Sequence, residues 1–406
     1  MHINNIKHRT YCKMRVWNFA VKIALYVVIG ALLCEYLIYH LVTIQCTWPE
    51  LKAANMENKD TTLRAFFIAD THLLGSREGH WFDKLRREWQ MERSFQSAMT
   101  WLRPDAVFVL GDLTDEGKWA SDGEFDATIQ RFWKMFYHHG DVEFHIVAGN
   151  HDMGFHDYVS EKLRRRFDIK FKSSSVKIIT IKGNTFVLVN SMTMHLDRCT
   201  ICSPATEELR RASMQLNCSR YGSPNGATST SSPSKVSQKC KNFKSLPPGR
   251  PILLQHFPLY RESDATCTGV DAAPPDERYV KFRQGWDTLP KDASKRLLSW
   301  IQPRLVLSGH THHGCSVRHG NDDDNSIPEV SVPSFSWRNR NNPSVVLVTM
   351  TNGDFEISKC FLPEESMVIM MYTIWGLILV LWIFVRICRP STRLLGMYGL
   401  AKLKSP

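Results

Sequence analysis

The sequence predicts an α/β fold held between two membrane-spanning helices. Short apolar runs that end in metal-binding types of residue alternate with helical patterns across the middle of the chain. Long apolar runs lie near both ends, at Ile23–Val42 and Met367–Val385, with basic residues on their outer sides. The 406 residues, 43% of them hydrophobic, are enough to bury a core, which excludes wholesale disorder and collagen-like structure.

The two apolar runs differ in how clearly they predict a membrane span. Residues 367–385 carry no charge and are followed at once by Arg386, which predicts a transmembrane helix. The first run is interrupted by Glu35, and a signal peptide is the competing interpretation. No small-residue cleavage site follows, which favours an uncleaved anchor at residues 23–44. Inside a membrane Glu35 is protonated, paired with a polar partner or directed toward the interface, and the sequence leaves all three open.

Nearly all of the net charge of +11 lies in the two tails. Residues 1–22 and 386–406 carry five cations each and no acid, so the region between them is almost neutral. That region lacks the basic surface that nucleic-acid binding requires, and we expect no nucleic-acid partner. The positive-inside rule predicts cytosolic tails at 1–22 and 386–406 and a luminal domain at 45–366.

Cysteine usage agrees with a luminal domain. Eight of the 11 cysteines lie there: Cys46, Cys199, Cys202, Cys218, Cys240, Cys267, Cys315 and Cys360. An oxidising lumen predicts disulfides, with pairings that the sequence does not reveal. Cys199, Cys202, Cys218 and Cys240 are alternatively a zinc site, although the long Ser-rich gap between them favours disulfides.

Residues 199–249 interrupt the α/β pattern. They are rich in Ser, Pro, Gly and Lys, show little hydrophobic periodicity, and predict a surface insertion. Asn217-Cys218-Ser219 is a glycosylation sequon within it, which suits a luminal surface.

Five apolar runs of the luminal region each end at metal-binding types of residue. Leu63–Ala69 ends at Asp70 and His72, Ala106–Leu110 at Asp112, Val142–Ala148 at Asn150, His151 and Asp152, Pro251–Gln255 at His256, and Arg304–Ser308 at His310 and His312. Runs of this kind predict buried strands, and the carboxyl ends of strands in α/β sheets are where sites form. We therefore expect these side chains to gather at one edge.

The other elements are predicted by their periodicity and turn residues. Helical patterns cover Trp81–Leu102, Asp122–His138 and Asp157–Phe167. Further strands are predicted at Val176–Ile181, Thr185–Asn190, Glu329–Val332 and Val345–Thr351. Lys182-Gly183-Asn184 predicts a hairpin turn between the first two of them.

The order of the polar motifs is specific even though each motif alone is weak. D-x-H, GD, GNHD, H and GHTH follow one another, each after an apolar strand. Oxygen donors mixed with imidazole suit Mn²⁺, Zn²⁺ or Fe rather than a thiolate site.

On these motifs the chain resembles the calcineurin-like metallophosphoesterases, over about residues 64–350. The resemblance implies a four-layer α-β-β-α sandwich of two mixed sheets and two divalent metal ions, expected to be Mn²⁺. It implies that Asp70, His72, Asp112 and His312 hold one metal, and that Asp112, Asn150, His256 and His310 hold the other. It also implies that His151 is the catalytic imidazole and that Asp152 orients it.

The whole layout, with a span at each end, resembles membrane-anchored family members that act on GPI anchors. The resemblance implies a phosphodiesterase that removes ethanolamine phosphate from the second mannose of GPI-anchored proteins and promotes their transport from the endoplasmic reticulum to the Golgi. Two metal ions, two aspartates and one hydroxide leave about one positive charge, which matches a phosphodiester. A hydrolase of nucleotides or lipid-linked pyrophosphates and a non-catalytic GPI-protein cargo receptor remain the alternatives.

The C-terminal tail predicts traffic between compartments. Lys402 and Lys404 stand at the −5 and −3 positions, which resembles the K-x-K-x-x signal that the COPI coat reads on cytosolic tails. We expect a protein of the endoplasmic reticulum exit sites, the intermediate compartment and the cis-Golgi, with cargo receptors as further possible partners.

Overall fold

The structure is a computed structural model that describes residues 2–52, 61–195, 197, 199–221, 240–320 and 326–388. It divides into two units that are considered separately. One unit contains residues 1–38 and 364–406, and the other contains residues 39–363. The predicted strands and sites lie in the second unit.

The first sheet of this unit has five strands in the order β11-β10-β1-β2-β3. These are β1 (Leu63–Ile68), β2 (Ala106–Leu110), β3 (Glu143–Val147), β10 (Ser344–Met350) and β11 (Phe355–Phe361). β1, β2 and β3 are parallel, and β10 is antiparallel to both β1 and β11, so the sheet is mixed.

The second sheet has six strands in the order β4-β5-β6-β7-β9-β8. These are β4 (Val176–Ile181), β5 (Asn184–Val189), β6 (Ile252–Gln255), β7 (Leu305–Ser308), β8 (Cys315–His319) and β9 (Ile327–Ser331). The β4–β5 hairpin turns at Lys182 and Gly183, whose φ values of 45° and 76° are both left-handed, as a two-residue hairpin turn requires.

The two sheets pack against each other because side chains alternate along each strand. Leu63, Ala65 and Phe67 of β1 belong to one buried cluster with residues of β6 and β7, whereas Phe66 and Ile68 belong to a cluster with the helices. Phe108 of β2 lies between Phe67 and Phe186, at ring-centroid distances of 4.9 and 4.8 Å. The expected sandwich of two mixed sheets is confirmed.

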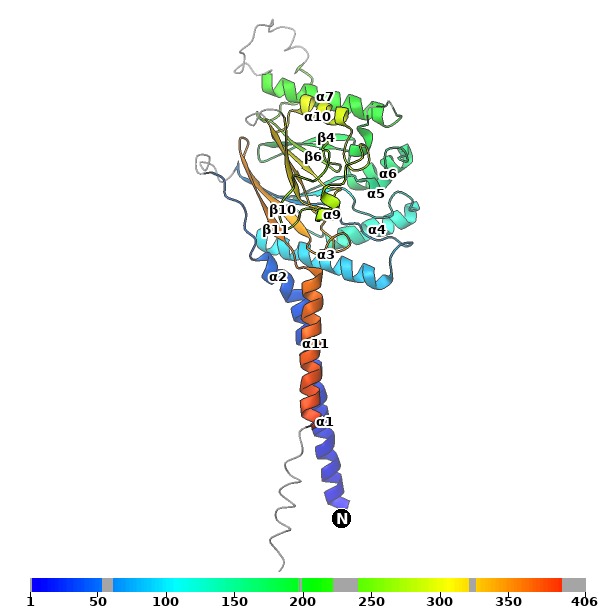
Figure 1. The fold of residues 1–406 in the computed structure, drawn as a ribbon, viewed down its shortest axis with the longest axis vertical. Helices are drawn as coiled ribbons and strands as arrows, with labels where there is room; N and C mark the ends of the chain where they lie inside the picture. Colours follow the sequence, from blue (N-terminus) through cyan, green and yellow to red (C-terminus); the bar gives the residue numbers. More distant parts are fainter. Residues whose placement is uncertain are drawn as a thin grey trace, which may run out of the picture. The chain divides into compact units, whose positions relative to one another are not determined.

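The longer helices pack on the sheets' outer faces (Figure 1). They are α3 (Trp81–Leu102), α4 (Asp122–Met135), α6 (Glu161–Phe171), α7 (Cys202–Tyr221) and α10 (Lys291–Ile301). The short helices α5 (Asn150–Met153) and α9 (Pro275–Arg278) and a 3₁₀ turn, η4 (Ser191–Thr193), lie in the connections. The bounds of α3 match the prediction. α6 begins four residues later than predicted because Ser160 caps it, accepting a hydrogen bond from Leu163 N.

Residues 199–249, predicted to be a surface insertion with little hydrophobic periodicity, contain a regular helix at residues 202–221. Helix α7 forms there and buries Ala205, Leu209, Ala212 and Leu216, which recur at helical spacing. It contacts α10 and the edge strand β4. Two of the four inward residues are alanines, so the apolar stripe is weak in the sequence.

All eight cysteines of the predicted luminal domain form disulfides, which confirms that expectation. The pairs are Cys46–Cys360, Cys199–Cys202, Cys218–Cys240 and Cys267–Cys315. The alternative zinc site of Cys199, Cys202, Cys218 and Cys240 is therefore wrong, because these four sulfurs are bonded in two pairs.

The other unit contains two apolar helical segments that lie side by side (Figure 1). They are α1 (His2–Leu32), with a π-helical turn η1 (Leu33–Leu37), and α11 (Glu365–Cys388). The next helix along the chain, α2 (Ile38–Thr43), belongs to the larger unit except for Ile38. Trp17–Thr43 and Glu365–Cys388 are long and apolar enough to cross a membrane. These candidate spans are consistent with membrane anchoring.

A hydrogen bond joins the two segments at Glu35. Tyr372 Oη donates to Glu35 Oε1 at 2.6 Å, and Glu35 lies in the π-helical turn. Nearby, Trp375 Nε1 donates to Tyr26 O at 3.1 Å, and a Cβ on Gly30 would collide with the indole. Of the three options for Glu35, the structure shows pairing with a polar partner.

Candidate active site

The turns that follow five strands bring all seven predicted metal-binding residues together. Asp70, His72 and His312 form one group, and Asp112, His256 and His310 form a second, with potential ligand atoms within 4.8 Å of one another in each group. Asn150 joins the second group, because its Oδ1 lies 3.0 Å from His256 Nε2. The residues of the two groups follow strands of both sheets, and they meet as their positions at the strand ends predicted.

The backbone at these turns is strained. Asp70, His72, Asp112, His310 and His312 have φ values of 54°, 44°, 47°, 74° and 61°, in the left-handed region that non-glycine residues rarely adopt. Such conformations persist only where surrounding contacts enforce them, and they concentrate at functional sites.

Glycines next to the site allow the turns to approach closely. A Cβ on Gly111 would collide with the ring of His256, and a Cβ on Gly149 would collide with Asp112. Only glycine fits these two positions, which explains the GD and GNHD motifs physically.

Asp112 lies between the two groups. Its Oδ2 is buried without a hydrogen-bond partner, 3.6 Å from His72 Nε2 and 3.3 Å from His256 Nε2. A buried carboxylate oxygen that lacks a donor is costly unless a cation binds it. An oxygen placed between two imidazole nitrogens suits a bridging ligand.

The ring orientations leave one nitrogen of each of three histidines available to a metal. His256 Nδ1 lies 2.7 Å from Leu110 O, and His310 Nε2 lies 2.6 Å from Trp286 O. A carbonyl oxygen only accepts, so these nitrogens carry the protons and the opposite nitrogens are free. His72 Nδ1 likewise faces the Asp115 carboxylate at 3.0 Å, and second-sphere contacts of this type orient metal ligands.

The electrostatics of the cluster also favour a cation. Burial raises the pKa of Asp70 to about 8. Burial would also raise the pKa of Asp112, but the neighbouring His256, His151 and His72 hold it well below its usual range. Burial opposes protonation of His256, yet the Asp112 and Asp70 charges raise its pKa to about 9. The carboxylates thus favour binding of a cation in this buried cluster. The combination of oxygen and imidazole donors fits two divalent metal ions.

Two further imidazoles, those of His310 and His312, are held neutral. Burial and the adjacent His256 lower the pKa of His310 to about 3. Burial and the adjacent His72 hold the pKa of His312 well below its usual range. Neutral imidazole is the form that binds metal ions.

His151 lies at the rim of the cluster and is only partly buried. Its Nδ1 is 3.1 Å from both the backbone oxygen and Oδ1 of Asp115. Nδ1 therefore carries a proton, and Nε2 is available for proton transfer. Burial disfavours the protonated imidazole, but the Asp112 and Asp115 carboxylates outweigh burial and raise the pKa of His151.

The orienting role expected for Asp152 falls to Asp115 in the structure. The Asp152 carboxylate accepts hydrogen bonds from the backbone N–H groups of Thr114 and Gly149, at 2.9 Å each. It fixes the turn that carries Asn150 and His151 instead of the imidazole itself. Burial and the Asp112 charge raise the pKa of Asp152 to about 7.

Sequence reasoning missed Asp115 and Arg338. Asp115 contacts both His72 and His151, and Arg338 pairs with its Oδ2 at 2.6 Å. Asp115 lies three residues after Asp112, and this closeness to a predicted ligand could have indicated that Asp115 belongs to the site. Arg338 lies in a loop more than 200 residues away, and no local pattern predicts its contact.

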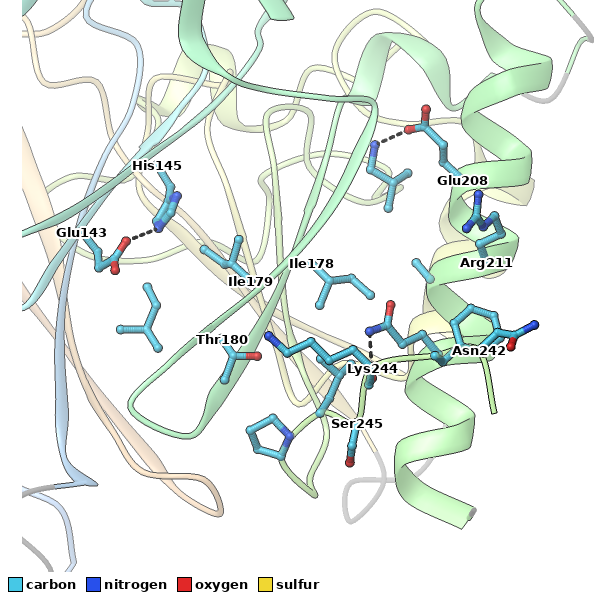
Figure 2. A pocket seen from close by; sticks show the side chains of 17 residues that line it. Glu143, His145, Ile178, Ile179, Thr180, Glu208, Arg211, Asn242, Lys244 and Ser245 are labelled. Carbon is cyan, nitrogen blue, oxygen red and sulfur yellow. Dashed lines mark hydrogen bonds and ion pairs between the residues drawn. The ribbon is translucent and has the colours of Figure 1, made fainter. Parts of the chain in front are cut away.

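A separate cavity of about 920 Å³ lies away from these residues (Figure 2). Residues of β3, β4 and α7 line it together with residues 242–247. β3 and β4 are edge strands of the two sheets, and α7 packs against β4.

Two neighbouring groups of metal-binding types of residue, with a partly buried imidazole at the rim, are the arrangement of a dinuclear phosphoesterase. The chain belongs to the calcineurin-like phosphoesterase family, whose sequence profile matches residues 63–314. It is 50% identical to Metallophosphoesterase 1 of Danio rerio over 339 residues, 84% of each chain. It is 48% identical to Metallophosphoesterase 1 of Cricetulus griseus over 378 residues, 93% of this chain and 92% of that one. It is therefore a metal-dependent hydrolase of phosphoesters.

Proposed function

We propose that this phosphoesterase is a Mn²⁺-dependent phosphodiesterase that removes ethanolamine phosphate from the second mannose of GPI anchors. The observation that carries the diester preference is the charge of the site. Asp70 and Asp112 are the only carboxylates among the seven predicted metal-binding residues, so two divalent ions leave an excess of positive charge for an anionic substrate. The predicted luminal orientation would put this site close to membrane-anchored glycans.

The residues divide into three roles in the proposed reaction. Asp70, His72, Asp112 and His312 would hold one ion, and Asp112, Asn150, His256 and His310 the other. The bound ions would supply Lewis acidity toward the phosphoryl oxygens.

The remaining residues move and position a proton. His151, with Nδ1 fixed by Asp115, would donate a proton from Nε2 to the departing sugar oxygen. Arg338 would hold the Asp115 carboxylate in place.

Hydrolysis assays with the purified full-length chain would test the proposal. The substrates would be an ethanolamine-phosphate mannose glycan, a nucleotide and a lipid-linked pyrophosphate, each with Mn²⁺, and His151→Ala would be the matched inactive control. We expect turnover of the first substrate only, and accumulation of GPI glycans that retain the phosphate in cells lacking the protein. Preference for either of the other substrates would establish the alternative hydrolase. Binding of GPI-proteins without turnover of any substrate would establish the cargo receptor.

We also propose that the protein cycles through the endoplasmic reticulum exit sites, the intermediate compartment and the cis-Golgi, by COPI recognition of Lys402 and Lys404. These lysines lie outside the described residues. Changing both to Ser, or adding one residue after Pro406, should shift the protein toward the later Golgi and the cell surface, as imaging against compartment markers would show. Unchanged localisation would reduce these lysines to ordinary tail charge. We propose cargo receptors as further partners.

A further inference from the structure

A second cluster of reactive side chains lies outside the metal site, around the Cys199–Cys202 disulfide. Potential ligand atoms of His156, Asp197, Cys199 and Cys202 lie within 4.8 Å of one another. Neither the metal site nor the proposed hydrolysis uses any of them. We propose that Cys199 and Cys202 form a thiol-exchange site, at which the disulfide is reduced by a thiol or dithiol partner while the other disulfides stay intact.

The first reason is the length of chain that each disulfide closes. Cys199 and Cys202 are three residues apart, whereas the separations of the other pairs are 22, 48 and 314 residues. A crosslink stabilises a fold in proportion to the chain entropy that it removes from the unfolded state, and this term grows with loop length. The folded state therefore stabilises the Cys199–Cys202 disulfide less than the other three disulfides, and this disulfide is the easiest to reduce.

The second reason is the position of the pair at a helix N-terminus. Cys202 is the first residue of α7, and its backbone N–H points at Cys199 Sγ at 3.0 Å. Helix N-termini stabilise a neighbouring thiolate through their unpaired N–H groups and their dipole. The reduced form of Cys199 is favoured by this arrangement.

The third reason is a proton donor beside the buried sulfur. His156 Nδ1 lies 3.7 Å from Cys202 Sγ and 3.1 Å from Met192 O, and His156 Nε2 lies 2.5 Å from Asp197 Oδ2. Each ring nitrogen of His156 thus faces an oxygen acceptor, and the Nδ1 edge of the ring lies beside the Cys202 sulfur. His195 stacks on this ring at 3.9 Å with the two planes 6° apart.

The exposure of the two sulfurs sets the direction of attack. Cys199 is partly exposed, whereas Cys202 is 1% exposed, so an incoming thiolate reaches Cys199. Its sulfur bonds to Cys199 Sγ, the Cys199–Cys202 bond breaks, and Cys202 leaves as a thiolate that takes a proton from His156. A second thiolate then attacks the mixed disulfide and releases Cys199. With glutathione, two thiols become one oxidised dimer and the protein gains two thiols.

The exchange site adjoins the wall of the metal site. Phe155, the neighbour of His156, packs on the Trp286 ring at 4.4 Å, and Trp286 O accepts the hydrogen bond of His310. His195 lies against Gly285, where an added Cβ would come within 2.8 Å of the ring. Phe155 and His195, which neighbour and stack on His156, therefore contact the loop that positions a metal-binding histidine.

Equilibration of the full-length chain in glutathione buffers of stepped ratio tests the proposal. After an acid quench, differential alkylation and peptide mass spectrometry would quantify each pair. The internal control is Cys218–Cys240, of which Cys218 lies in the same helix as Cys202. We expect half-reduction of Cys199–Cys202 at a glutathione ratio at least about tenfold less reducing than Cys218–Cys240 requires. Reduction of both pairs at the same ratio would overturn the proposal.

The role of His156 is tested separately by the rate of exchange. His156→Gln should slow reduction of Cys199–Cys202 by about tenfold, because the departing thiolate loses its proton donor. The matched control, His138→Gln, removes a histidine elsewhere and should leave that rate unchanged. An unchanged rate in His156→Gln would overturn the assignment of His156.

Discussion

The Nε2 atoms of His72 and His312 face each other at 3.1 Å, although 240 residues separate them in the chain. Metal–nitrogen bonds of about 2.1 Å place two ligands of one ion about this far apart. Asp112 Oδ2, at 3.6 Å from His72 Nε2, extends the group toward His256. The separation is therefore more consistent with a shared cation than with a hydrogen bond between two neutral rings.

We predict that Asp112→Ala and His151→Ala have different effects, because Asp112 is assigned to metal binding and His151 to proton transfer. Asp112→Ala should remove at least one metal ion per chain and abolish turnover, because both groups lose a ligand. His151→Ala should keep the metal content but lower kcat by about 10²- to 10⁴-fold, since it removes a general acid only. Elemental analysis paired with kinetics is the measurement, and Asp276→Ala, an exposed acid, is the control. Near-normal turnover in a folded His151→Ala chain would contradict the role given to His151.

A second prediction distinguishes Asp115 from Asp152. Asp115→Asn removes the carboxylate that faces both His72 and His151, and kcat should fall by about 10- to 100-fold. Asp152→Asn replaces an acceptor of two backbone N–H groups and should mainly lower the melting temperature. Steady-state kinetics and thermal unfolding of both variants make the comparison. A larger kinetic defect in Asp152→Asn would restore the orienting role to Asp152.

The gathering of these side chains could be predicted from the sequence because they lie at strand ends. Asp70, Asp112 and His256 each follow a buried strand within two residues, and strands in a sheet bring such positions together. The partner of His151 was not predictable in this way. Asp115 and Asp152 were both near in sequence, and only the backbone course shows which one faces the ring.

Pairings between segments far apart in the chain also could not be predicted from the sequence. Cys46 and Cys360 are 314 residues apart, and nothing local selects one partner among eight cysteines. The Glu35–Tyr372 hydrogen bond likewise joins residues 337 apart. Helix α7 was missed because its buried face includes alanines at 205 and 212 and only two leucines.

A third prediction concerns orientation in the membrane, which rests on the cation-rich tails. Tags at both termini should be digested in sealed microsomes while the catalytic domain stays protected. The Asn217→Gln variant should lose an endoglycosidase-sensitive mass shift, because Asn217 lies in the part predicted to be luminal. A protected C-terminal tag would contradict the orientation and the expectation of a luminal domain.

The fourth prediction is a pH dependence of stability set by His195. Burial and the adjacent His156 lower the pKa of His195 to about 4, below the usual value near 6.5. The unfolded state therefore binds a proton more readily than the folded state. The neutral His195 ring therefore contributes stability that is full above about pH 6.5 and is lost as the pH falls through 4. After allowance for solvent screening, this contribution to the free energy of unfolding is about 1–2 kcal/mol.

The variant His195→Phe isolates this effect. His195 Nε2 is buried without a hydrogen-bond partner, so phenylalanine keeps the stacking on His156 and sacrifices no hydrogen bond at that atom. The melting temperature of the full-length chain should fall less between pH 7.5 and pH 4.5 in His195→Phe than in the unmodified chain. His139→Gln, at an exposed histidine, should show the same fall as the unmodified chain. Equal falls in all three proteins would show that His195 is as easily protonated in the folded state as in the unfolded one.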